Sequence, residues 1–383
     1  HTISGNRRAA NGVTTPSADT LAQARITAER DVAATSTAPL QTVGHTAIER
    51  GGAAGLNEVL RTFAGVSVRD YGGIGGLQTV SVRNLGAQHT AVCYDGAVVS
   101  DAQTGQVDIS RFSIEDLAEV SVETGASDDI FRSARLTNAA GILNLKTIQG
   151  RDRLSARIRY ASFNTWSPSF SIGRTLGAGL YAGASVEWLS SDGDYPFTLT
   201  NGSITTRERR LGSDVKTIKT EADLTGQAGH NGRFNIKARY HNSDRGLPGS
   251  VIYYIQNPTE RLSNQDAGLS VGYTATIGDK WRIREDLSSN WSRTRYTNAT
   301  SYLPEPEDDR YRQHELSSST IIEYRTSDRL RFTIAEDLFS NVLRATIPEC
   351  PQPSRLSSVS AVSGQWKDEN ITITASLGAT GIR

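Results

Sequence analysis

The stretch RLSARIRYASF, residues 153–163, decides the fold because its residues alternate in character with a period of two. Leu154 and Ile158 fall on one face of an extended chain, and Ser155 and Arg157 fall on the other. A period of two is that of a β-strand, whose successive side chains point to opposite faces. The stretch predicts a strand, and it stands where a mixed N-terminal sequence gives way to alternating runs.

The same alternation returns in roughly eleven runs after residue 150, many of them about ten residues or longer. Strands of soluble proteins usually have about five or six residues. A ten-residue strand rises about 33 Å and, tilted near 45°, covers roughly 24 Å, the height of the apolar band of an outer-membrane barrel. The pattern therefore predicts a membrane β-barrel, although alternation alone leaves a soluble β-sandwich or propeller open. The clearest runs are 180–188, 234–240, 269–277, 316–324, 330–338 and 371–377.

Composition excludes several classes of protein. Only 37% of the residues are hydrophobic, the mean hydropathy is −0.40, and no run approaches the ~18 apolar residues that a spanning helix needs. A helical membrane protein is excluded, whereas a barrel with a polar lumen fits such values. The 41 basic and 41 acidic residues give a formal charge of zero, so no electrostatic footprint for nucleic acid is present.

The residues that usually carry chemistry form no catalytic pattern. The six histidines are scattered, and Cys93 and Cys350 fit no metal-binding spacing. The glycines of 72–76 do not follow a strand and open a helix, as a dinucleotide site requires. We therefore predict neither an enzyme nor a resident cofactor.

The segment before residue 150 reads as a small α+β domain. Residues 56–63 have the spacing of a short amphipathic helix, with Leu56, Val59, Leu60 and Phe63 on one face. Strand-like pieces follow at 79–83, 91–94, 117–122 and 141–147, with a turn at Asp95-Gly96.

Taken in order, these segments resemble the plug of TonB-dependent outer-membrane receptors. LNEVLRTFAGV at 56–66 resembles the family's L-x-x-V-L-x-x-x-P-G-V opening, with Phe63-Ala64 near its Pro position. GGIGG at 72–76 and SVR at 81–83 resemble the glycine-rich apex loop and the strand that ends in Arg. YDGA at 94–97 is similar to the D-G-V turn, and GILNLKT at 141–147 to the exit strand.

Two departures affect residues that would make plug-to-barrel charge contacts, but not the fold. Asn84 follows Arg83 where the family has Gly, and Thr124-Gly125-Ala126 stands in place of an R-G-P turn. Within the family, the closest likeness is to the cobalamin (vitamin B12) receptor branch of Bacteroides-type bacteria. The segments that carry this likeness are 71–76, 84–92, 100–113, 128–135 and 243–254.

The resemblance implies a transmembrane antiparallel β-barrel of about 22 strands when complete, of which about half is present, closed by an α+β plug in its lumen. The expected domains are a flexible arm at 1–32, a plug at 33–149 and the N-terminal half of the barrel at 150–383. The family draws work from TonB in the inner membrane, and a strand-like arm could add to a sheet edge of that partner. An ordinary disordered arm is the alternative. The expected TonB box consists of Leu21, Ala22, Gln23, Ala24, Arg25, Ile26, Thr27 and Ala28.

A ligand of this family docks between the plug apex and the extracellular loops, where aromatic and amide groups suit a large amphipathic ring. Each such residue can also be an ordinary solvated loop residue. Asp192 and Asp194 could serve calcium, although a plain surface turn is the simpler reading of their spacing. The expected ligand contacts are Tyr71, Ile74, Gln103, Thr104, Gln106, Tyr195, Tyr253 and Tyr254.

The function implied is TonB-dependent transport of a scarce large nutrient, a corrinoid first, across the bacterial outer membrane. A ferric siderophore or haem is the nearest rival ligand. A glycan-import receptor that works with a surface lipoprotein, or a passive porin, belongs to a different class. The expected partners are TonB, a corrinoid or iron chelate, outer-membrane lipid and, in the glycan case, the lipoprotein, but no nucleic acid.

Overall fold

The computed structural model describes residues 40–101, 103–125, 128–177, 179–249, 251, 258–299, 305–347, 350, 352–369 and 371–383. The expected TonB box and the expected contacts Tyr253 and Tyr254 lie outside these residues. No helix in the described part of the chain has the length and apolar character needed to cross a membrane.

Residues 40–147, here called the plug segment, form a small α+β domain. Its central sheet has five strands in the order β1, β6, β7, β4, β5, and only the β4–β7 pair is parallel. β2 and β3 pair separately as a hairpin. The elements are β1 (Leu40–Gly44), α2 (His45–Gly51), α3 (Leu56–Leu60), β2 (Val66–Tyr71), β3 (Leu77–Val82), η1 (Ala87–His89), β4 (Thr90–Tyr94), β5 (Ala97–Val99), η2 (Ile109–Arg111), β6 (Leu117–Thr124), α4 (Ala134–Thr137) and β7 (Gly141–Thr147).

The plug segment has an apolar core of its own. Leu56, Val59, Leu60 and Phe63 are all buried in it, which confirms the predicted apolar face. The helix itself is shorter than predicted, because α3 ends at Leu60 and the chain turns through hydrogen bonds from Thr62 N and Phe63 N to carbonyls one turn back. The core also takes in β3, β6 and β7, so the domain is held by burial as well as by its sheet.

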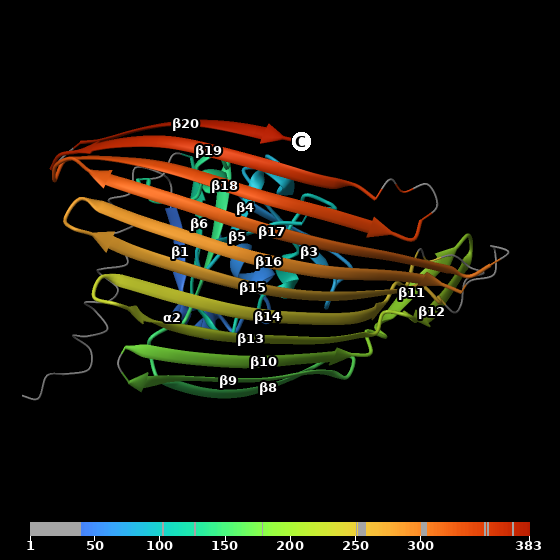
Figure 1. Ribbon diagram of the computed structural model, residues 1–383. Coiled ribbons are helices and arrows are strands. Elements are labelled where there is room, and N and C mark those ends of the chain that lie inside the picture. The colour runs from blue at the N-terminus through green and yellow to red at the C-terminus, as the bar shows by residue number, and fades with distance from the viewer. Residues whose placement is uncertain are drawn as a thin grey trace, which may run out of the picture. The chain divides into compact units, whose positions relative to one another are not determined.

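The residues after 150 form one antiparallel sheet of eleven strands, here called the long sheet. Each strand pairs with its neighbours in sequence, as Figure 1 shows from β8 to β20, and only the hairpin of β11 and β12 stands apart. This confirms the predicted number of alternating runs. The strands are β8 (Arg153–Ala161), β9 (Thr165–Gly177), β10 (Leu180–Ser191), β11 (Pro196–Asn201), β12 (Ile204–Arg209), β13 (Val215–Ala228), β14 (Gly232–Gly246), β15 (Arg261–Ile277), β16 (Trp281–Asn298), β17 (Glu307–Arg325), β18 (Leu330–Ala345), β19 (Ser354–Lys367) and β20 (Thr372–Ile382).

The two ends of the long sheet differ in their connections. Residues 192–214, 247–260, 299–306 and 346–353 join strands at one end, here called the long-loop end. At the other end, the short-turn end, the connections run only through 178–179, 229–231, 278–280, 326–329 and 368–371. Membrane barrels of the bacterial outer membrane have short turns on the periplasmic side and long loops outside.

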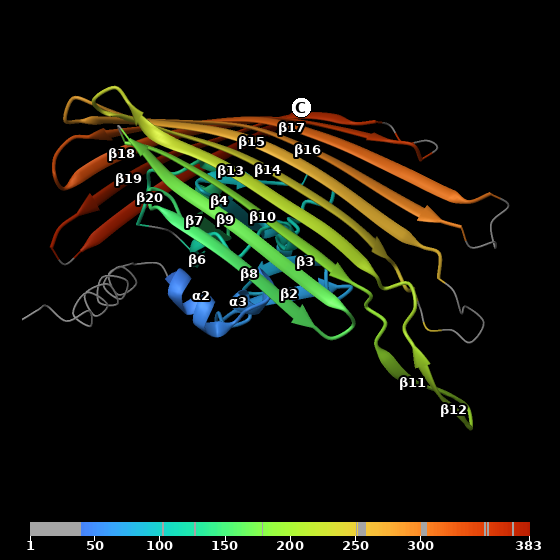
Figure 2. The same cartoon turned by 90° about the horizontal axis from the view of Figure 1, so that it is seen from below.

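The two faces of the long sheet also differ. It curves over the plug segment (Figure 2), and side chains on the covered face, such as Lys237, Glu315 and Asp337, contact that segment. The opposite, outward face carries the apolar residues of the predicted alternation, among them Leu269, Tyr273 and Ile334, which are exposed by 43–58%. A sheet that is polar toward a plugged interior and apolar outside has the pattern of a barrel wall.

Candidate functional site between the plug segment and the long sheet

The tip of the β2–β3 hairpin forms the apex of the plug segment and lies at the long-loop end. The Gly75 carbonyl accepts a hydrogen bond of 2.6 Å from Nη1 of Arg245, which lies near the C-terminal end of β14. Gly75 has a φ of 71°, and a Cβ added there would collide with Val215. Tyr71 and Ile74, two of the predicted ligand contacts, are 50% and 49% exposed beside this tip. The hairpin therefore presents unpaired apolar surface at the end of the sheet where a ligand would arrive.

The second loop at this end, residues 101–106, holds three further predicted contacts. Asp101 Oδ1 accepts hydrogen bonds from the backbone N–H groups of Gln103 and Thr104 and from the Thr104 hydroxyl. Gln103 accepts a hydrogen bond of 3.0 Å from Gln313 on β17, while Gln106 is half-buried. Gln103 and Thr104 are thus exposed but already engaged, and a ligand would have to compete for their polar atoms.

The loop residues predicted to bind a ligand or calcium lie near β11. Tyr195 is 44% exposed and packs edge-on against Phe163, with ring centroids 6.2 Å apart. Asp192 accepts a hydrogen bond from Asn164, and Asp194 forms an ion pair of 3.3 Å with Arg209. Within the described residues no group of three or more His, Cys, Asp or Glu could hold a metal ion. The calcium site stays a prediction for which the described carboxylates give no added support.

Among the cavities at the interface, three are lined by residues of both β13 and β14. The first, of about 380 Å³, opens beside Ile74 and reaches His241. The second, of about 50 Å³, lies between Phe112 of the plug segment and Arg239. The third, of about 640 Å³, lies at the short-turn end around Asn235. Unfilled space thus accompanies β13 and β14 from the apex to the short-turn end.

A buried cluster of charged groups separates the second cavity from the third. Lys237 Nζ lies 2.6 Å from Asp95 Oδ2 and 3.3 Å from Glu221 Oε2, and 4.3 Å from the centroid of the Tyr94 ring. Thr147 donates to Asp95 from both its N–H and its hydroxyl, each at 2.7 Å. The sequence predicts the Asp95-Gly96 turn but not its partners Glu221 and Lys237, which stand far away along the chain.

The pKa of Tyr94 reflects this setting. Burial, followed by the adjoining carboxylate of Glu221, raises the pKa of the phenol well above its usual value. Tyr94 therefore stays protonated, and its hydroxyl donates a hydrogen bond of 2.5 Å to Glu221 Oε2. Burial also raises the pKa of the neighbouring Cys93 thiol to about 11, so this thiol is neutral and unreactive in the folded plug segment.

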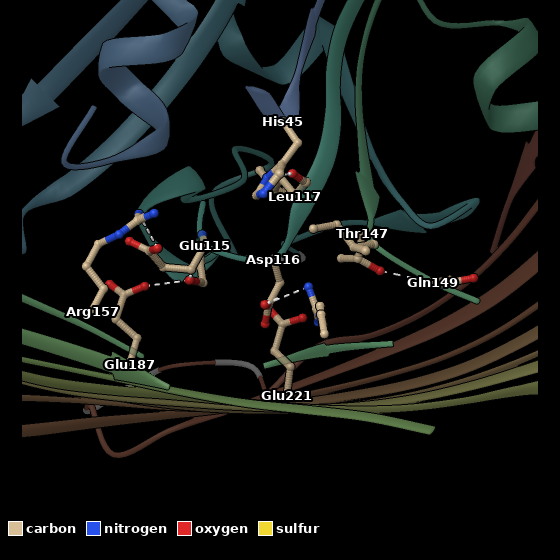
Figure 3. A network of polar contacts seen from close by, with 12 residues as sticks. His45, Glu115, Asp116, Leu117, Thr147, Gln149, Arg157, Glu187 and Glu221 are labelled. Atoms are coloured by element: carbon tan, nitrogen blue, oxygen red, sulfur yellow. Dashed lines mark hydrogen bonds and ion pairs between the residues drawn. The ribbon is translucent and has the colours of Figure 1, made fainter. Parts of the chain in front are cut away.

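A second set of ion pairs joins the plug segment to the first strand of the long sheet. Glu115 pairs with Arg157 and, at 3.0 Å, with Arg159, and Asp116 pairs with Arg153 at 2.9 Å. Figure 3 shows Glu115 and Asp116 next to each other on the plug segment, facing side chains of the long sheet. In the ion pairs of Glu115, Asp116 and Asp95, the carboxylate belongs to the plug segment and the cation belongs to the long sheet. These ion pairs were not predicted from the sequence, because no local pattern marks the partner of a charged residue.

Comparison with known proteins agrees with this geometry. Residues 32–136 match the family described as TonB-dependent Receptor Plug Domain. The copper transporter OprC aligns with a TM-score of 0.68 at 13% identity over 90% of this chain and 55% of that one. A mutant of the ferric enterobactin receptor PfeA from Pseudomonas aeruginosa gives 0.68 at 15% identity, over 93% and 58%. The FrpB iron transporter from Neisseria meningitidis gives 0.70 at 14% identity, over 90% and 59%.

This chain spans 55–59% of the length of those three structures. At identities this low, the TM-scores show a shared fold alone. The family match covers the plug segment as far as residue 136, and the structural matches extend through the long sheet. The chain therefore carries a TonB-dependent receptor plug domain and has the plug-and-barrel fold of TonB-dependent receptors.

Proposed function

We propose that this chain belongs to an outer-membrane receptor that imports a metal chelate and draws the work from TonB. The observation that carries the proposal is the seating of the plug segment against the polar face of the long sheet, held by buried ion pairs such as Lys237 to Asp95. A lumen filled in this way is closed to passive diffusion. A passive porin would leave that space to water, so the plug favours energised transport.

Moving the plug segment would require work, because the ion pairs that hold it against the long sheet are buried. Breaking one partner of a buried ion pair typically costs about 3–5 kcal/mol. Residues 21–28 are the proposed handle through which TonB would apply the work. Deleting residues 20–28 should leave ligand binding intact and abolish uptake, since binding occurs at the apex and the work enters from the arm. Uptake that persists in this deletion would contradict energised transport.

The ligand that we place first is a ferric siderophore. Receptors of similar fold include those for ferric enterobactin and ferric yersiniabactin. A corrinoid comes second and rests on the sequence resemblance of 71–76 and 84–92 to cobalamin receptors. Both are large chelates that present apolar as well as polar surface, and the apolar part suits the exposed Tyr71 and Ile74.

Equilibrium binding to the full-length protein in detergent tests the ligand class. We expect one of ferric enterobactin, cyanocobalamin and haem to bind far more tightly than the other two. In the proposed site, Tyr71→Ala with Ile74→Ser should weaken that ligand by roughly tenfold or more, because two exposed apolar contacts are lost. Tyr160→Ala, which removes an aromatic side chain from the outward face, is the matched control. Equal loss in both variants would refute an apex site.

A glycan-import receptor with a surface lipoprotein remains the alternative of a different class. It predicts that none of the three chelates binds and that an oligosaccharide does so in the presence of the lipoprotein. Binding of a chelate by the receptor alone would exclude it.

A further inference from the structure

A row of three arginines crosses the outward face of the long sheet near the long-loop end. Arg293 on β16 is the direct cross-strand partner of Arg312 on β17, which in turn pairs with Arg344 on β18. These strands lie side by side in Figure 1. Directly opposed residues share a face, and Gln313, next to Arg312, bonds to the plug segment, so the arginines face outward. Like charges in directly opposed positions destabilise a sheet.

The neighbouring row shows how the protein neutralises such charges elsewhere. Arg295 and Arg310, also directly opposed, both bind Asp308, which accepts hydrogen bonds of 2.8 Å from Arg295 Nε and 3.1 Å from Arg310 Nε. In contrast, the three arginines of the row form no ion pair and no side-chain hydrogen bond with any residue that the structure describes. The row therefore lacks a counter-charge of its own.

Two amides extend the same row. Gln265 on β15 is directly opposite Arg293, and Asn242 on β14 is directly opposite Gln265. All five side chains share the outward face because direct partners in a sheet do so. The five positions thus form one line of hydrogen-bond donors, with its cations grouped on β16 to β18.

The row lies just beyond the apolar band. Trp291, His314 and Val342 form the next outward row toward the short-turn end, and Trp281 marks the other border of the band ten positions away. Such a separation spans roughly 24 Å along a tilted strand, the height of a membrane apolar band, and tryptophans mark its two borders. The arginines would therefore stand at the level of the lipid headgroups in the outer leaflet.

We propose that this arginine row binds the phosphorylated headgroup of an outer-leaflet lipid. Guanidinium groups bind phosphate through two parallel hydrogen bonds, and strands about 4.8 Å apart place three of them across roughly 10 Å. The adjacent apolar surface, which includes Leu316 and Leu338, is available to the acyl chains. The inference rests on the proposed function, because it requires the long sheet to span an outer membrane.

Lipid affinity of the delipidated full-length protein tests this site. The probes are bisphosphorylated lipid A, the same lipid without phosphates, and inorganic phosphate. Wild-type protein should prefer the bisphosphorylated lipid to both of the others. Removing an interfacial arginine weakens binding roughly fivefold, so R293Q/R312Q/R344Q should lose on the order of 100-fold. The control R151Q/R174Q/R207Q removes three exposed arginines outside the row and should lose little.

The outcomes separate the site from its alternatives. Equal affinity for the phosphorylated and dephosphorylated lipids, or equal losses in the two triple variants, would overturn the proposal. Competition by millimolar inorganic phosphate as effective as by the lipid would show an anion site without lipid specificity and would also overturn it. If the triple variant does not fold, the lipid affinity of R312Q and the preference of the wild-type protein among the three probes test the proposal instead. Chelate binding, measured in parallel, reports on the proposed function independently.

Discussion

Replacing Lys237 with Met should loosen the plug segment strongly while leaving the long sheet folded. Lys237 is the only cation within ion-pair distance of Asp95 and Glu221 among the described residues, and all three side chains are less than 10% exposed. Methionine keeps the aliphatic stem but leaves two carboxylates buried without their counter-charge. Loss of one partner of such a pair costs about 3–5 kcal/mol.

The buried Cys93 thiol supplies the assay. In a Cys350→Ser background it is the one remaining cysteine, and it can be labelled only when the plug segment opens. A loss of about 3–5 kcal/mol raises the open population, and with it the labelling rate, by roughly 10² to 10³-fold or more. The five tryptophans all belong to the long sheet, so their fluorescence shows separately whether the sheet stays folded.

Lys146→Met is the matched control, because Lys146 also forms a lysine–carboxylate pair, at 2.9 Å with Glu119, but is 61% exposed. Surface pairs contribute about 0–1 kcal/mol, which corresponds to less than about fivefold in labelling. If K237M labelled Cys93 no faster than K146M, the buried cluster would not hold the plug segment, and the reasoning would be wrong.

Three further predictions concern other parts of the interface and the sheet. Because the folded-state pKa of Cys93 is raised from 9.0 to about 11, the stability linked to its neutral thiol is complete below pH 9 and is lost as the pH rises through 11. The melting temperature of the plug segment should fall over that window, and less in Cys93→Ala. Gly75→Ala should lower the stability of the plug segment by about 1–3 kcal/mol, because of the positive φ at this position and the clash with Val215. Adding Val215→Ala should restore only the part that is due to the clash, and the rate of Cys93 labelling measures both effects. Glu336 faces outward within the apolar band and accepts hydrogen bonds from Ser358 and Ser360. Because an amide carries no charge, Glu336→Gln should stabilise the long sheet by about 1 kcal/mol, measured by urea unfolding from vesicles.

Sequence was a sufficient guide wherever the physical signal is local. The alternation of apolar and polar residues predicted the strands of the long sheet, and the apolar face of 56–63 predicted its burial, because both depend on residues two to four positions apart. The short strands β1, β2 and β5 were not predicted, since three to six residues carry little periodic signal.

The candidate site was predicted only in outline. Tyr71 and Ile74 were placed at the apex because the glycine-rich segment 72–76 resembles the apex loop of the family, and both side chains are exposed there. The pairing of Asp95 with Lys237 depends on the register of β14 against the plug segment, and no pattern in a single sequence specifies that register. The outward carboxylates Glu285 and Glu336 were also not predicted, because they interrupt the apolar alternation and are stabilised by hydroxyls of neighbouring strands.

The distribution of contacts determines which part of the plug segment would yield first to a pull from the N-terminus. β1 is an edge strand that pairs only with β6, and its first residue, Leu40, is paired with Glu123. A pull on the chain before Leu40 would open this antiparallel pair one residue at a time, so each step would cost about one ladder hydrogen bond. The step at Gln41 would also break the two exposed hydrogen bonds that its side chain makes with the Ala64 backbone. The next connections include the His45 contact with the Leu117 carbonyl and the Glu49 pair with Arg157, both partly exposed and therefore weak. The side chain of Ile48, in contrast, is buried in the apolar core and anchors α2. The Lys237 cluster contacts the far side of the central sheet, at the ends of β4 and β7, and its charged side chains are less than 10% exposed. The hydrogen bonds of β1 thus come first along the chain, and the core contact of Ile48 and the buried Lys237 cluster come after them. The first work done would therefore release β1 while α2 and the base of the plug segment stayed in place.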